Sequence, residues 1–318
     1  MVSSGIELAT VFVLAAALLI DRLIGDPHTP FHPVALIGRF IGFWGRAALY
    51  PPVVQRFVGV FFWCGTILLF AFPFLLFSHF APELLYLAFA PFLLKCCFAW
   101  RALEEHAASV VVAVGDGVES GRESVRQMVS RDTAGLDREH ILSAAYESLT
   151  ENITDSIVAP LLFYGFLGLT GAAVYRAANT MDAMLGYRDE RERIGWFSAR
   201  MDDVLTFIPA RVTATLLLVY FAAKGRFSPA YTIMRRDGRR RPGFNGGIIM
   251  AAMAGGAGVR FEKPGVYTIG DPIRSLDDGG PEIFRAVRSV TLMAAGLTAM
   301  VAFGTLFLLG TWINNIGI

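Results

Sequence analysis

One stretch of the chain decides the fold: from Arg131 to Arg211 it reads RDTAGLDREHILSAAYESLTENITDSIVAPLLFYGFLGLTGAAVYRAANTMDAMLGYRDERERIGWFSARMDDVLTFIPAR. Acids, amides and arginines alternate there with apolar runs of the kind that lie in membranes. In a helix, Glu147, Glu151 and Asp155 would stack on one face because they are spaced i, i+4, i+8. Like charges at this spacing repel each other, so we expect a positive partner opposite them, either Mg²⁺ or arginine.

The segment before the first apolar run, 101–154, is polar and reads as a series of helices outside the membrane. Asp137 is placed to cap the helix that carries Glu147. A structural alternative is that the carboxylates lie on a solvated helix face, with Asn152 or Thr154 capping the apolar helix that follows.

Similar polar pairs recur at the edges of the later apolar runs. Asn179 and Asp182 are spaced i, i+3, and Asp202 and Asp203 stand just before VLTFIPARVTATLLLVYF. Either acid of the second pair could simply cap a helix and favour its positive end. One cap needs one residue, so capping does not explain the second acid.

Composition indicates a membrane protein. The 318 residues are 54% hydrophobic and 17% charged, with a mean hydropathy of +0.52, which is too apolar for an ordinary soluble domain. The net charge of +1 gives no general attraction to nucleic acid, and the basic run RRDGRRRP is typical of a loop that orients a span. Three cysteines in apolar segments indicate neither a disulfide framework nor a metal site.

We therefore predict an all-α polytopic integral membrane protein, one domain over 1–318, with four to five transmembrane helices. Apolar runs place the spans at about 6–20, 57–77, 84–100, 204–223 and 289–313. A polar helical loop is expected over 101–154 and a basic, glycine-rich loop over 224–288. Positive-inside counting conflicts with a simple crossing at 204–223, so either Pro209 breaks that run or the topology before it differs.

The segment 155–184 presents a geometric choice. One continuous helix would separate Asp155 from Asp182 by about 27 steps of 1.5 Å, roughly 40 Å, and put them on opposite sides of a bilayer. The glycines of Gly168-Leu169-Thr170-Gly171 lie near the middle of this segment. A break there would give two half-helices, so we predict a re-entrant helical hairpin.

The N-terminal third offers weaker signals. Four residues of its first loop have side chains that could bind a metal: Asp21, Asp26, His28 and His32. Because prolines interrupt this loop, the four residues lack regular helical spacing. The alternative to metal binding is a structural role in which they form hydrogen bonds. We expect Lys95 to extend toward the nearby membrane surface, and Trp44 and Tyr50 to lie in the aromatic belt of an interfacial helix.

Common nucleotide and hydrolase motifs are missing: the sequence has no GxxxxGK[ST] loop, GxGxxG, HExxH or GxSxG. At its polar positions it resembles a known family, the adenosylcobinamide-phosphate synthases of cobalamin biosynthesis, called CobD or CbiB. The matching strings are DRLIGDPHTPFHPVALIGRFI, SRDTAGLDREHILSAAYESLTENITDSIVAPLLFYGFLGLTGAAVYRAANTMDAMLGYR and FSARMDDVLTFIPARVTA, with a weaker match at FNGGIIMAAMAGGAGV. The chain departs from the family's pattern at Gly243-Phe244, near Met250 and at Thr206.

The resemblance implies an integral membrane enzyme that uses ATP to join aminopropanol, or its phosphate, to a propionate carboxylate of adenosylcobyric acid. The catalytic residues that it implies are Glu147, Glu151, Asp155, Asp182, Asp202 and Asp203. The implied substrate-binding residues are His32, Arg131, Asp132, Asn152, Asn179, Arg200, Arg211 and Asn245. Our hypothesis is that carboxylates hold Mg²⁺ on the nucleotide phosphates while arginines stabilise the transferring charge. The expected metal ligands are Glu151, Asp155, Asp182 and Asp202.

A general base must also deprotonate the attacking ammonium, and Glu147 or His32 is expected in this role. The expected cofactors are Mg²⁺ and ATP, and the expected location is the inner cell membrane with the active face in the cytoplasm. Besides its substrates the protein would contact membrane lipid, and a homo-oligomer is compatible with the sequence. Two other classes stay open: a membrane transporter or binding protein for a corrinoid, and a non-catalytic membrane sensor on the same scaffold.

Overall fold

The computed structural model describes residues 2–26, 29–30 and 32–316, and the regular secondary structure within them is helical apart from one short β-hairpin. This confirms the expected all-α class. The chain packs as two compact units. The first unit comprises 1–99, 159–205 and 295–318, and the second comprises 100–158 and 206–294.

The first unit is built mainly of apolar helices. Its helices are α1 (Val2–Ile24), α2 (Pro33–Trp44), α3 (Gln55–Phe80), α4 (Glu83–Lys95), α8 (Ala159–Leu185), α9 (Glu192–Leu205) and the C-terminal part of α13, with a 3-10 turn at Ala47–Leu49. The longest of them are α1, α3, α8 and α13. Helix α1 packs against α4, while α8 packs against α2, α3 and α9. A core cluster that includes Ile41, Trp44, Met181 and Ile194 joins α2, α8 and α9.

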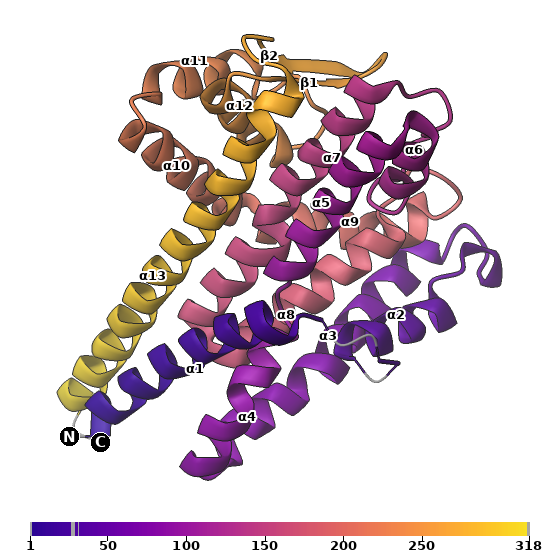
Figure 1. Ribbon diagram of the computed structural model, residues 1–318. Coiled ribbons are helices and arrows are strands. Elements are labelled where there is room, and N and C mark those ends of the chain that lie inside the picture. Colours follow the sequence, from indigo (N-terminus) through magenta and orange to yellow (C-terminus); the bar gives the residue numbers. More distant parts are fainter. Residues whose placement is uncertain (1, 27–28, 31, 317–318) are drawn as a thin grey trace. The chain divides into compact units, whose positions relative to one another are not determined.

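The second unit combines amphipathic and small-residue helices. Its helices are α5 (Trp100–Asp116), α6 (Val118–Arg126), α7 (Arg138–Ile153), α10 (Phe207–Ala223), α11 (Phe227–Asp237), α12 (Gly246–Ala257) and the N-terminal part of α13 (Leu276–Ile316), with a π-helical turn η2 at Thr154–Val158. Strands β1 (Arg260–Lys263) and β2 (Tyr267–Gly270) pair antiparallel, and Arg260 faces Gly270. Figure 1 shows this hairpin beside α11 and α12.

Helix α8 reverses direction at Gly168. The φ of 63° and ψ of −156° at Gly168 lie in a region that is essentially open to glycine alone. The rings of Phe163 and Tyr175 stack at 5.2 Å, although twelve residues of continuous helix would separate them by about 18 Å. The two halves of α8 therefore fold back on each other, at the glycine pair where the sequence predicts a break.

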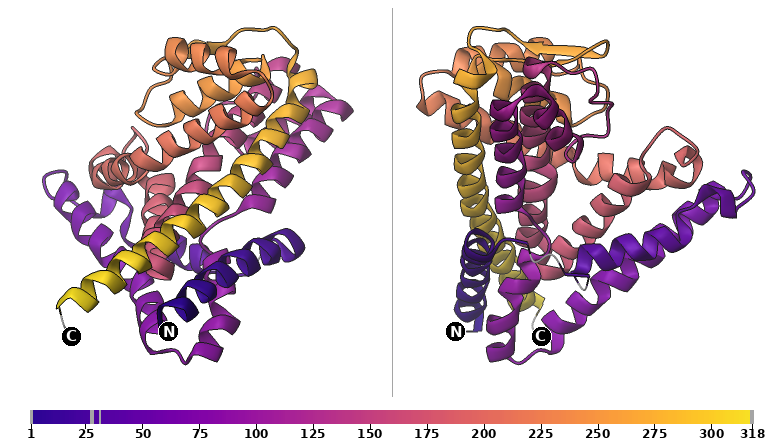
Figure 2. Two further views of the ribbon diagram at one scale, coloured as in Figure 1. Left: turned by 90° about the vertical axis from the view of Figure 1, so that its left-hand side faces the viewer. Right: turned by 45° about the vertical axis from the view of Figure 1, so that its right-hand side comes forward.

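Four helical segments of the described residues are long and apolar enough to cross a membrane. They are Gln55–Phe80, Glu83–Asp116, Arg138–Leu185 and Leu276–Thr305, and a fifth is reached if α9 and α10 count together as one broken span. The reversal at Gly168 lies inside the third segment. Helix α13, which begins at Leu276 well before the expected span of 289–313, is the long yellow helix in the left view of Figure 2.

Three expectations from the sequence differ from the structure. The range 224–288, expected as a basic loop region with one short small-residue helix, contains that helix as α12 and also α11, the β-hairpin and the start of α13. Trp44 has no exposed surface and stacks on Phe62 at 5.2 Å, so it is a core residue rather than a belt residue. Lys95 is 3% exposed and forms ion pairs with Asp21 and Asp26, so it does not extend toward the membrane surface.

Candidate functional site

Helix α7 carries the carboxylates on which the site of the second unit is built. Asp137 caps it, as predicted, by accepting a hydrogen bond of 2.9 Å from the backbone N–H of His140. This bond outweighs the effect of burial and, with the His140 ring, lowers the pKa of Asp137. The capped helix then presents Ser143, Glu147 and Glu151 at successive turns of one face.

Glu147 is 4% exposed, and the groups around it occupy both of its oxygens. Ser143 Oγ donates to Oε1 at 2.6 Å, and Tyr267 Oη donates to Oε2 at 2.5 Å. Arg131 Nη2 lies 3.4 Å from Oε2. Burial and the neighbouring Glu147 charge raise the pKa of the Tyr267 phenol, which keeps its proton available for this bond.

Glu151, one turn further on, pairs with Arg241 from the loop between α11 and α12. The pair is partly exposed, 33% for the Glu151 side chain and 24% for the Arg241 side chain. Arg241 lies over Gly246, where a Cβ would come within 2.9 Å of Arg241 Nη1 and 3.3 Å of Glu151 Oε1. Glycine at 246 therefore leaves the space that this ion pair needs.

Asn245, the residue before Gly246, connects this region to Arg211 on α10. Arg211 Nη1 donates to Asn245 Oδ1 at 2.6 Å, and Nη2 donates to the carbonyl of Phe244 at 3.1 Å. The guanidinium also lies over the Phe207 ring, 3.5 Å from its centroid. We call the connected set the arginine–carboxylate cluster; its members are Arg131, Glu147, Glu151, Arg211, Arg241, Asn245 and Tyr267.

The arginine–carboxylate cluster is suited to an anion. It contains three guanidinium groups and two carboxylates, so it carries a net positive charge. Arg131 Nη1 is buried and has no hydrogen-bond partner among the residues that the structure describes. A buried donor without a partner is costly, and an anionic oxygen of a ligand would satisfy it. For Glu147 and Glu151, an arginine lies opposite the carboxylate, as one of the two expected partners.

Three further expected residues of the second unit have local roles. Asp155 belongs to the π-helical turn η2, so the regular stack expected over three helical turns ends at Ile153. Asn152 Nδ2 donates to the carbonyl of Ser148 at 2.9 Å and does not cap the next helix. Asp132 is exposed and accepts from the N–H of Ala134 at 3.0 Å.

The remaining expected acids and amides lie in the first unit, on α8 and α9. Asn179 Nδ2 donates to Asp202 Oδ1 at 3.2 Å, which joins the two helices. Asp182 follows Asn179 by one turn, and a Cβ at Gly186 would lie 2.1 Å from Asp182 Oδ1. Asp202 and its neighbour Asp203 stand in the last turn of α9, so neither is the N-cap of α10, which is Thr206.

Arg200, on the same helix, lies 4.0 Å from Asp203 at a spacing of i, i+3. The side chains of both residues are more than one third exposed, 59% for Arg200 and 37% for Asp203. An exposed pair at this distance contributes little to stability, so Arg200 is available to another anion.

His32 begins α2 in the first unit, where its Nδ1 accepts from the N–H of Val34 at 3.3 Å. Its Nε2 is buried and has no hydrogen-bond partner in the described part of the chain. Burial lowers the pKa of His32, Asp26 opposes this effect, and the charge of Lys95 adds to it. The neutral ring is therefore favoured. His28, the other histidine of this loop, lies outside the described residues.

The carboxylates expected to bind metal are divided between the units. Glu151 and Asp155 belong to the second unit, and Asp182 and Asp202 belong to the first. Within the described residues, no group of three or more histidine, cysteine, aspartate or glutamate side chains is placed to hold a metal ion. Mg²⁺ that arrives with a nucleotide needs only one or two carboxylates besides the phosphates.

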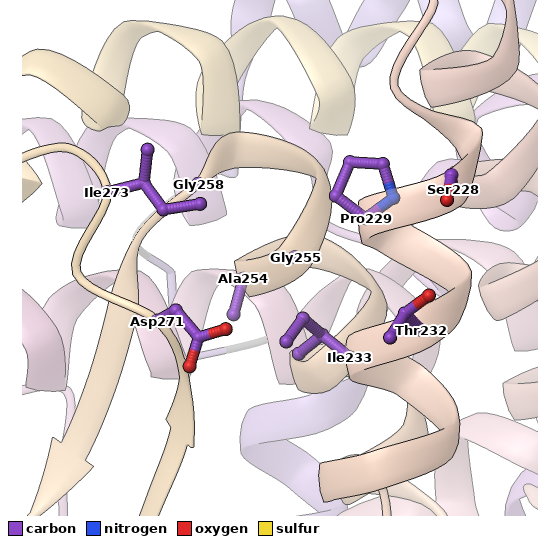
Figure 3. Close-up of a pocket in the computed structure, with 9 residues that line it drawn as sticks. All are labelled: Ser228, Pro229, Thr232, Ile233, Ala254, Gly255, Gly258, Asp271 and Ile273. Carbon is purple, nitrogen blue, oxygen red and sulfur yellow. The ribbon is translucent and has the colours of Figure 1, made fainter.

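A separate cavity of about 290 Å³ lies between α11, α12 and the segment after β2. Figure 3 shows Asp271, Thr232 and Ser228 as its polar lining beside Ile233, Ala254 and Ile273. Asp271 is the single ionised residue of this lining, and Arg236 neutralises it with hydrogen bonds of 2.8 and 3.0 Å. The cavity is therefore less suited to an ion than the arginine–carboxylate cluster.

Sequence reasoning missed Ser143, Tyr267 and Arg241. Ser143 stands four residues before Glu147, and this spacing was a usable signal. Tyr267 and Arg241 lie 120 and 90 residues from their partners in the chain, so no local pattern could have found them.

Comparison with known proteins places the chain among one group of relatives. The family model described as CobD/Cbib protein matches residues 14–308. A protein of Methanothermobacter thermautotrophicus named probable cobalamin biosynthesis protein CobD is 40% identical over 296 residues, covering 92% of this chain and 97% of the relative. A Thermococcus kodakarensis protein of the same name is 40% identical, covering 91% and 93%. The cobalamin biosynthesis protein CobD of Dehalococcoides mccartyi is 39% identical, covering 85% and 89%. No solved structure matches.

Proposed function

The chain belongs to the CobD/CbiB protein family, and from this premise we propose that it is the adenosylcobinamide-phosphate synthase of cobalamin biosynthesis. The proposed reaction joins aminopropanol, or aminopropanol phosphate, to a propionate carboxylate of adenosylcobyric acid and consumes ATP. The observation that carries the proposal is the arginine–carboxylate cluster, whose buried Arg131 Nη1 lacks a partner in the described residues.

The reaction requires activation of a carboxylate, and the arginine–carboxylate cluster is suited to this step. A carboxylate does not react with an amine at a useful rate until one oxygen becomes a leaving group. Phosphoryl transfer from ATP to the propionate would form an acyl phosphate, the amine nitrogen would attack its carbonyl carbon, and phosphate would leave. The charge that develops on the transferring phosphoryl group is best stabilised by fixed donors such as guanidinium groups.

We propose that Arg131 and Arg211 contact phosphate oxygens and that Arg241 does so after leaving Glu151. Glu147 then acts as a positioning residue that holds Arg131, because Ser143 and Tyr267 already occupy its oxygens. This leaves His32 as the proposed general base, since its lowered pKa favours the neutral ring and its Nε2 makes no hydrogen bond to the described residues.

The acids of the first unit are proposed to bind Mg²⁺ together with the nucleotide. Asp182 and Asp202 are near Asn179, and two carboxylates with phosphate oxygens and waters suffice for Mg²⁺. For Glu151 and Asp155, which belong to the second unit, metal binding stays a prediction from the sequence. The basic run of α11 and the loop after it favours a cytoplasmic position for the second unit by the positive-inside rule, and the inner membrane is the proposed location.

The test is ATP turnover by the purified full-length protein in lipid nanodiscs. We expect ADP release to need both cobyric acid and an aminopropanol donor, with an amide product detected by mass spectrometry. Corrinoid uptake by sealed vesicles without ATP turnover would instead support transport. The absence of both activities would support a sensor.

Single-residue variants test whether the predicted acids take part in the reaction. Asp155→Asn and Asp182→Asn should each lower amide formation by at least 100-fold, the order expected when one charge-stabilising contact is removed. Glu105→Gln, which changes an exposed acid paired with Arg101, is the matched control and should leave the rate unchanged. Near-normal rates in both aspartate variants would overturn the assignment.

A further inference from the structure

A second basic feature of the second unit lies beside the arginine–carboxylate cluster, in a groove formed by α10, α11 and α12. Figure 1 shows these three helices together. The groove has a volume of about 470 Å³, and the residues used below are Arg211, Leu218, Met234, Arg235, Arg239 and Ile248. We call it the α10–α12 groove.

The polar end of the α10–α12 groove has three guanidinium groups and no acid. Arg211 is held by Asn245 and Phe244, and Arg235 reaches only the hydroxyl of Tyr231, at 3.4 Å. None of Arg211, Arg235 and Arg239 pairs with a carboxylate among the residues that the structure describes. Three positive charges without a counter-ion favour a strongly anionic ligand such as a phosphate group.

The local sequence explains this excess charge. Between positions 206 and 259 the sole acidic residue is Asp237. Asp237 has no exposed surface, and it is already paired with Arg236 at 2.7 Å and with Arg240 at 3.0 Å. The charges of the groove therefore have no acid of their own segment to neutralise them.

The other wall of the α10–α12 groove is apolar. Leu218, Met234 and Ile248 line it and are each half-buried. On the outside of α10, Ile208 is 66% exposed and Val219 is 51% exposed, as expected for side chains that face lipid. A ligand with a phosphate at one end and hydrocarbon at the other matches both walls.

Two aromatic residues on α11 precede the groove residues Met234 and Arg235, and one of them, Tyr231, contacts Arg235. Phe227 and Tyr231, on α11, stack at 5.6 Å and are 48% and 38% exposed. Partly exposed aromatic pairs at the start of a basic helix are typical of the membrane–water interface. The polar end of the groove is thereby placed at the level of lipid headgroups.

We propose that the α10–α12 groove binds the phosphate headgroup of an acidic phospholipid. The phosphate contacts Arg235 and Arg239, and an acyl chain lies along Leu218 and Met234. A neutral lipid gains less, because its own cationic headgroup opposes the three arginines. This inference concerns lipid retention and does not depend on the proposed reaction.

The experiment measures lipid retention by the full-length protein. Protein from nanodiscs that contain equal phosphatidylglycerol and phosphatidylcholine is examined by native mass spectrometry, and we expect phosphatidylglycerol to be retained selectively. Each arginine near a lipid surface contributes roughly 1 kcal/mol, about five-fold in affinity. The double variant Arg235→Gln, Arg239→Gln should therefore weaken retention by about 25-fold. Arg260→Gln, which removes a surface arginine paired with Glu262, is the matched control and should retain the lipid.

Two further arms distinguish the sources of phosphate. Inorganic phosphate or ATP should fail to displace the lipid from the wild-type protein, and displacement by either would identify a soluble-phosphate site and overturn the proposal. Equal retention of both lipids would also overturn it. If the double variant does not fold, a photoactivatable phosphatidylglycerol is cross-linked to the wild-type protein: attachment to peptides of α10 and α11 supports the proposal, and attachment elsewhere contradicts it.

Discussion

Replacing Glu147 by glutamine tests the proposed positioning of Arg131 most directly. The Glu147 side chain is 6% exposed and the Arg131 side chain 12% exposed, so water screens their charges poorly. Glutamine keeps the shape but removes the charge, and its amide hydrogens face the hydroxyl hydrogen of either Ser143 or Tyr267. Removing one partner of a buried pair costs about 3 kcal/mol or more, because the other charge is left uncompensated.

The magnitude can be measured as a shift in thermal unfolding. For a chain of this size about 1 kcal/mol corresponds to roughly 2 °C, so Glu147→Gln should lower the midpoint by about 6 °C. Tyr267→Phe removes one hydrogen bond to a charged group and should cost about 1.5 to 3 kcal/mol. Glu105→Gln disrupts an exposed i, i+4 pair with Arg101 and should cost at most about 0.5 kcal/mol.

A double-mutant cycle separates the ion pair from general damage to packing. If Glu147 acts through Arg131, then Glu147→Gln combined with Arg131→Gln should cost clearly less than the sum of the two single variants. The assay is differential scanning fluorimetry of the protein in detergent, repeated in nanodiscs. A Glu147→Gln midpoint within error of Glu105→Gln, or strict additivity in the cycle, would refute the reasoning.

Three other expectations follow. Gly246→Ala should displace the Arg241 guanidinium, which lies 2.9 Å from the added Cβ, and raise the KM for ATP if Arg241 takes up phosphate; an unchanged KM would contradict this. Burial disfavours the ionised form of Asp237, but the hydrogen bonds and charges of its neighbours outweigh burial and lower its pKa. Ionised Asp237 therefore stabilises the fold above about pH 4, and this contribution is lost as the pH falls through the lowered pKa. Asp237→Asn should flatten the acid limb of a melting-temperature profile. Gly168→Ala should destabilise by about 1 to 3 kcal/mol because of its backbone angles, whereas Gly65→Ala, in open space within a helix, should be neutral or stabilising.

Much of the fold was predictable because it depends on local patterns. The apolar runs located the long helices, and the glycines at 168 and 171 located the reversal of α8. Asp137 was recognisable as a cap from its place before a helical pattern. The β-hairpin of 260–270 was missed because its two strands have only four residues each, and they follow a run of glycine and alanine that reads as loop or helix.

Pairing between distant residues was the part that sequence could not supply. Lys95 was expected to reach the membrane surface, yet Asp21 and Asp26 hold it in the interior of the first unit. The expected repulsion along α7 predicted that a cation was needed, but not that Arg241 would provide it. Nothing local to either partner encodes such a choice, because it follows from how the chain packs.

The arrangement of charge in the arginine–carboxylate cluster has a chemical consequence. Glu147 fixes the Arg131 guanidinium before any substrate arrives, so the orientation of this group costs no further entropy on binding. The Glu147 side chain is held in place because Ser143 and Tyr267 both donate hydrogen bonds to it. The Glu151–Arg241 pair is partly exposed and can separate. The cluster therefore pairs a rigid donor at Arg131 with a movable one at Arg241, which suits a phosphoryl group that must be held during transfer and released afterwards.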